Sequence, residues 1–124
     1  MANQPDSRAN RSDDATLRDT ISRTVVRLLA ERTGRGPTNA RTTIDRDLIV
    51  VLLQHTLTPG ERFLAESDRA GQVLDIRAAY QDAMRTDCIT AIEALTDRTV
   101  VSFMSANAID PDAAAEIFVM DRPM

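Results

Sequence analysis

The 124-residue chain contains no lysine and no tryptophan, and only one cysteine and one histidine. A single cysteine, Cys88, excludes an internal disulfide and is compatible with a reducing cytoplasm, where we expect the protein to reside. A single histidine, His55, cannot build the usual histidine-rich metal site within one chain. The sequence therefore predicts neither a metal ion nor a cofactor.

Long apolar segments are also missing from the chain. The longest apolar run has six residues, 48–53, whereas a membrane-spanning helix needs roughly 18 to 20. Residues 1–14 are polar and charged and lack the apolar centre of a signal peptide. We expect no direct membrane insertion.

The charge balance argues against a nucleic-acid partner. The formal net charge is -4, and the fifteen basic residues, all arginines, are spread along the chain without a dense cluster. An arginine-only basic set is compatible with recognition of phosphate or carboxylate groups, and equally with the base composition of a genome. Both explanations remain open, but bulk attraction to nucleic acid or anionic lipid is not expected.

Length and periodicity predict one domain. With 43% hydrophobic and 27% charged residues, the composition is that of a globular protein. We expect a disordered tail over residues 1–13 and a single domain over residues 14–124, beginning with a helix capped by Ser12 and ended by Gly34. The apolar stripe of this helix consists of Leu17, Ile21, Val25, Leu28 and Leu29.

Two further helices and two hairpins follow. Thr58, Pro59 and Glu61 form the signature of a capping box that opens a short helix through Ser67. A three- and four-residue apolar repeat predicts a long helix over residues 72–95, which should overhang the sheet at one end. The predicted strands are residues 40–45, 48–55, 99–106 and 116–121.

This order of elements predicts an α+β fold: an αββαββ two-layer sandwich with a four-stranded antiparallel sheet and helices on one face. The strands carry apolar residues on both faces, so the face without helices would expose more apolar surface than a monomer usually tolerates. We therefore expect a homodimer or a complex through the outer face. The candidate association face consists of Ile49, Val51, Leu53, Met104, Phe118 and Met120.

No group of reactive side chains predicts catalysis, so we expect a protein that is not an enzyme. Cys88 and His55 could pair as nucleophile and base, but Cys88 lies on the apolar face of the long helix, where a thiol is normally inert. Asp110, Asp112 and Glu116 could hold a hard cation in a loop, but the spacing of a calcium loop is missing and a solvated turn explains them better. The enzyme alternative is a hydrolase or transferase that uses carboxylates, and it would require a deep cleft that holds several perturbed Asp or Glu groups.

The turn Gly34, Arg35, Gly36 and Pro37 is a candidate contact for an anion or a partner. Its backbone amides and guanidinium could bind bicarbonate or phosphate. Phosphate-binding loops normally follow a strand and open a helix, whereas this turn follows a helix and opens a strand. Helix termination is the competing explanation.

Several short motifs in a fixed order resemble the MpsC-domain family, named for a sodium-translocating, membrane-potential-generating system. The motifs are the segments 34–37, 47–51, 57–61, 77–85, 103–107 and 110–112. The likeness spans roughly residues 17–121, and it departs at Asp97, where we expect a glycine and hence an altered turn.

The resemblance implies a small soluble accessory or regulatory protein linked to a membrane ion-transport or inorganic-carbon uptake system, with a membrane protein as its partner. It supplies no catalytic residues. The alternative is a sensor that binds a small anion, such as bicarbonate or phosphate, at a dimer interface.

Overall fold

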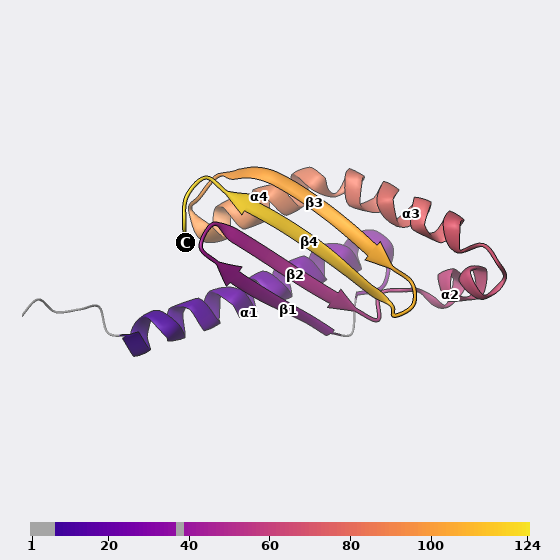
Figure 1. The fold of residues 1–124 in the computed structure, drawn as a ribbon, viewed down its shortest axis with the longest axis horizontal. Coiled ribbons are helices and arrows are strands. Elements are labelled where there is room, and N and C mark those ends of the chain that lie inside the picture. The colour runs from indigo at the N-terminus through magenta and orange to yellow at the C-terminus, as the bar shows by residue number, and fades with distance from the viewer. Residues whose placement is uncertain (1–6, 37–38) are drawn as a thin grey trace, which may run out of the picture.

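The computed structural model describes residues 7–36 and 39–124, which form helices on one side of an antiparallel sheet (Figure 1). In chain order the elements are α1 (Ser7–Thr33), β1 (Asn39–Asp45), β2 (Leu48–Gln54), α2 (Pro59–Glu66), α3 (Ala70–Ala83), α4 (Arg85–Thr96), β3 (Val100–Ala108) and β4 (Ala113–Met120). The predicted α+β class and the four-stranded antiparallel sheet are confirmed. The strand order is β1-β2-β4-β3.

The helices divide the covered face of the sheet between them. α1 packs along β1, and the α3–α4 pair packs along β3, with α1 and α4 also in contact (Figure 1). The core between the layers contains Ile21 and Val25 of α1 and Ile92 of α4, against Ile49 of β2 and Phe118 of β4. α2 and the start of α3 extend past the ends of the strands and form an overhang of the sheet at one end (Figure 1).

α1 starts earlier than the sequence suggested. It begins at Ser7, so Ser12 lies inside the helix and the expected cap at that residue is wrong. The predicted stripe is confirmed, because Ile21 and Val25 are buried and its leucines pack against the core. Of the predicted tail, residues 1–6 lie outside the described part of the chain.

Two other boundaries differ from expectation. The single long helix predicted over residues 72–95 is divided at Met84, a buried turn residue between α3 and α4. β4 starts at Ala113 instead of Glu116, because Ala113, Ala114 and Ala115 pair with β2 on one side and with β3 on the other. The sequence did not indicate this part of the strand, since alanine has a low strand propensity. Glu116 is therefore a residue of the strand interior and not of a carboxylate-bearing loop.

Most of the predicted association face lies on the wrong side of the sheet. Thr42 of β1 pairs with Val51 of β2, and its hydroxyl contacts Ser22 Oγ of α1 at 2.7 Å, so this face is the one that the helices cover. The residues buried there are Ile49, Val51, Leu53, Phe118 and Met120. Met104 alone lies on the opposite face, where it is 48% exposed. Successive side chains of a strand point to opposite faces of the sheet, and residues 48–53 are apolar on both faces. The sequence therefore did not indicate which face the helices cover.

Asp97 ends α4 in the left-handed conformation, with φ of 55°, which glycine adopts at less cost.

Candidate functional site

A cavity of about 250 Å³ lies on the helix side of the sheet, between the last turns of α1, the middle of α3 and the ends of β2, β3 and β4. Its apolar lining includes Leu29, Leu53, Ile76, Tyr80 and Ala114. Its polar lining consists of Thr33, Thr56, Thr58, Glu61, Arg77, Gln81, Asn107 and Glu116. One pocket therefore combines an apolar wall with several side chains that can form hydrogen bonds.

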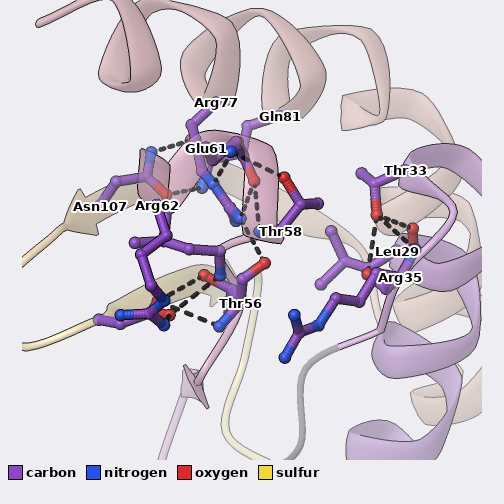
Figure 2. Close-up of polar contacts among 12 residues, drawn as sticks. Leu29, Thr33, Arg35, Thr56, Thr58, Glu61, Arg62, Arg77, Gln81 and Asn107 are labelled. Atoms are coloured by element: carbon purple, nitrogen blue, oxygen red, sulfur yellow. Dashed lines mark hydrogen bonds and ion pairs between the residues drawn. The ribbon is translucent and has the colours of Figure 1, made fainter. Parts of the chain in front are cut away.

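An ion pair between α2 and α3 borders this cavity. Arg77 Nη2 lies 2.8 Å from Glu61 Oε1, and Arg77 Nε lies 3.1 Å from Glu61 Oε2, while Nη2 also donates to the Thr56 carbonyl (Figure 2). The side chains of Arg77 and Glu61 are only 15% and 14% exposed. The charge of Arg77 is therefore met within the protein by a two-bond contact to one carboxylate.

Glu61 also completes the capping box predicted at the start of α2. The Glu61 N–H donates to Thr58 Oγ1 at 3.1 Å, and the Thr58 N–H donates to Glu61 Oε1 at 2.9 Å. α2 buries none of its residues, and its ion pairs to the rest of the domain join Glu61 to Arg77 and Arg62 to Asp112.

Asp112 joins the β3–β4 turn to the segment between β2 and α2. Its carboxylate accepts hydrogen bonds from the N–H and hydroxyl of Thr56 and from the N–H of Leu57, at 2.9–3.0 Å, and Arg62 Nη2 lies 3.4 Å away. Burial by itself would raise the pKa of Asp112, but the hydrogen bonds from Leu57 and Thr56 outweigh it and lower the pKa below its usual value. Asp112 is thus an anchoring residue of the fold, and the metal-binding alternative is not needed to explain it.

Glu116 is the most unusual side chain of the cavity. It lies in the middle of β4, is only 3% exposed, and accepts hydrogen bonds from Gln81 Nε2 at 3.1 Å and from the Ser105 hydroxyl. Gln81 is oriented by a reciprocal amide pair with Asn107, at 2.7 and 3.2 Å (Figure 2). Burial raises the pKa of Glu116, and the hydrogen bonds offset only part of that rise. Among the described residues, Glu116 forms no ion pair.

The turn after α1 has a structural role that accounts for its glycines. Gly34 takes φ of 80° and its N–H donates to the Ala30 carbonyl at 3.0 Å, so it ends the helix. A Cβ on Gly36 would lie 3.3 Å from Ala30 Cβ and from Val26 Cγ1, so the chain passes close to α1 at this residue. Arg35 is partly exposed beside them, and Pro37 lies outside the described residues. The anion contact at this turn stays a prediction.

The two residues considered as a reactive pair are in different environments. His55 is exposed, whereas Cys88 is 3% exposed within the core, where burial raises the pKa of its thiol to about 12. A thiol with this pKa is almost entirely protonated at neutral pH and is a poor nucleophile.

A second candidate surface is the open face of the sheet. Figure 1 shows α1, α3 and α4 on the other side of the strands. We call this uncovered side of the sheet the open face. From the strand pairing and the burial pattern, its apolar residues are Leu48, Val50, Leu52, Met104, Ala106, Ala115, Ile117 and Val119. All are partly or largely exposed.

The sequence-based predictions did not identify the role of Glu116 or the residues that form the open face. The sequence did contain a signal for Glu116, because it is the one charged residue in the segment 113–120. If this segment forms a strand with apolar neighbours on both sides, its one charged side chain is expected to be buried. The alanines before it masked the strand.

Comparison with known proteins adds one finding. The family model described as "Na+-translocating membrane potential-generating system (MpsC)" matches residues 14–122. No curated protein and no solved structure matches the chain significantly. Within residues 7–36 and 39–124, no helix has the length and apolar content needed to cross a membrane.

Proposed function

The chain belongs to the MpsC family, and we propose that it is a non-enzymatic accessory or regulatory protein. It acts by association with other proteins, and its first partner is a second copy of itself, bound through the open face. The observation that carries the proposal is the uncovered sheet face, which presents Leu48, Val50, Leu52, Ile117 and Val119 on its two central strands. A contiguous apolar surface of this kind on a protein of this size is typical of an interaction site.

The arrangement of charges at the edge of the open face supports a second copy as the occupant. On β1, Arg41 and Asp45 lie two residues on either side of Thr43, all three exposed on this face. A two-fold interface is reciprocal: a residue on one side of the axis faces the residue at the same distance on the other side in the second copy. If the axis runs across the strands along the row Thr43, Val50, Ile117 and Met104, Arg41 of one copy faces Asp45 of the other.

This packing also matches the apolar residues to one another. The same axis places Leu48 of one copy over Leu52 of the other, so aliphatic side chains of the central strands meet near the axis. Fully burying one such side chain contributes about 1.5–3 kcal/mol.

The test is the oligomeric state of Val50→Asp, measured by sedimentation over a range of concentrations. A desolvated carboxylate near the axis costs about 3 kcal/mol, so we expect the dimer dissociation constant to rise by roughly 100-fold. Val50 is on the surface of the isolated chain, so the monomer should keep its circular dichroism spectrum.

Leu74→Asp is the matched control, because Leu74 is an exposed leucine on α3, away from the open face. It should leave the dimer intact. Val50→Thr, which keeps the β-branched shape, provides a milder variant in case the aspartate variant does not fold. A wild-type monomer at all concentrations would refute the proposed dimer.

We further propose that the protein resides in the cytoplasm and docks, independently of its dimerisation, on a protein component of a membrane ion-transport or inorganic-carbon uptake system. The family description supports a link to a sodium-translocating system that generates a membrane potential. The overhang offers a contact site apart from the open face, since Phe63 of α2 is 67% exposed. In preparations from native membranes, the component should therefore co-purify with Val50→Asp as well as with the wild type.

A further inference from the structure

We propose that the cavity beside Glu116 binds a small aliphatic primary ammonium ion, with the ammonium group on the Glu116 carboxylate and the alkyl chain against the apolar wall. This ligand site is separate from the open face, because the cavity lies on the helix side of the sheet. It therefore does not depend on the proposed dimer.

The charges around the cavity favour a cation over an anion. Arg77 is the cationic residue of the lining, and its guanidinium is already engaged by Glu61 and by the Thr56 carbonyl. Glu116 has two neutral donors, Gln81 and Ser105, and among the described residues no cationic partner within ion-pair distance. A buried carboxylate without a countercharge is costly, and a bound cation would supply that countercharge.

The remaining acceptor capacity of Glu116 allows the contact. An ionised carboxylate has about four lone-pair positions, and the hydrogen bonds from Gln81 and Ser105 use two of them. An ammonium group has three donors and can bind the carboxylate together with a further acceptor, such as the Asn107 amide oxygen at the cavity wall.

The size and lining of the cavity set the rest of the ligand. A volume of about 250 Å³ is below the roughly 300–1,000 Å³ of most ligand sites, so the ligand is small. Leu29, Leu53 and Ile76 come from α1, β2 and α3 and offer an apolar wall to a short alkyl chain. An uncharged or anionic molecule of the same shape would gain this apolar contact but not the ion pair.

The experiment uses three probes that share a four-carbon chain: n-butylammonium chloride, n-butanol and sodium n-butyrate, at matched ionic strength. Binding to the full chain is followed by the NMR signals of the Gln81 and Asn107 side-chain amides. We expect saturable shifts with n-butylammonium and at least about tenfold weaker binding of the other two probes. The Glu116→Gln variant should lose at least about tenfold in affinity for the ammonium probe.

The pH dependence in the wild-type protein gives a second readout that does not require the variant to fold. The groups near Glu116 are Arg77, Glu61 and Tyr80 at the cavity, Cys88 from α4, and Asp82 and Arg85, which line a neighbouring pocket with Gln81 and Ser105. Arginines stay charged, and an alkylammonium ion stays protonated below about pH 9. Affinity should therefore rise between pH 4 and pH 8 as Glu116 ionises.

Three results would overturn the proposal: equal or tighter binding of n-butyrate or n-butanol, unchanged affinity of folded Glu116→Gln, or affinity for n-butylammonium that is independent of pH over this range.

Discussion

At the scale of single residues, Asp112 shows how one carboxylate fixes two segments that are far apart in the sequence. Its oxygens accept three hydrogen bonds from Thr56 and Leu57, and its side chain is only 6% exposed. The lowered pKa of Asp112 means that the ionised form is the one that stabilises the fold.

We expect Asp112→Asn to lower the free energy of unfolding by about 2 kcal/mol at neutral pH, because an amide has one acceptor oxygen where the carboxylate has two. The wild type should lose this advantage as the pH falls below the unfolded-state value of 3.8 and through the lower folded-state pKa. Urea unfolding of both proteins as a function of pH measures the difference. Asp110→Asn, an exposed neighbour in the same turn, is the control and should change stability little.

Glu116 marks the limit of residue-level inference from this sequence. Capping residues could be recognised because their signal is local: Thr58 and Glu61 are three residues apart, and the structure confirms both hydrogen bonds. The environment of Glu116 depends on which strands flank β4 and on the position of Gln81 in α3, which no local pattern encodes. The cavity could not be predicted for the same reason.

At the scale of secondary-structure elements, α2 depends on its cap more than the other helices do. It has eight residues, none of them buried, and it lies beyond the end of the sheet (Figure 1). Its polar contacts are the Thr58 capping box and the ion pairs Glu61–Arg77 and Arg62–Asp112.

We expect Thr58→Ala to cost about 1 kcal/mol in the local stability of α2, since the Glu61 N–H loses its acceptor. Hydrogen exchange should accelerate in α2 while the amides of β2 and β4 keep their protection. Thr90→Ala, at an exposed position on α4, is the matched control. Equal acceleration in α2 and in the sheet would contradict a local role for the cap.

At the scale of the whole molecule, the order of helices and hairpins and the one-sided helical layer were predictable, because amphipathic spacing and turn residues are local. The strand order β1-β2-β4-β3 was not, since two hairpins can be joined at either edge. The sequence assigned the wrong residues to the open face, because the segment Leu48 to Leu53 is apolar on both faces of the strand. Only the packing of α1 on Thr42 shows which face is covered.

The central claim is that the open face joins two copies across a two-fold axis, and it is tested most directly by intermolecular NOEs between methyl groups in a mixture of labelled and unlabelled protein. Leu48 and Leu52 lie about 13 Å apart along one strand, too far for a contact within one chain. We expect an intermolecular NOE between Leu48 of one copy and Leu52 of the other, and none from Leu74 on α3. Intermolecular NOEs from Leu74 without any between Leu48 and Leu52 would contradict the claim.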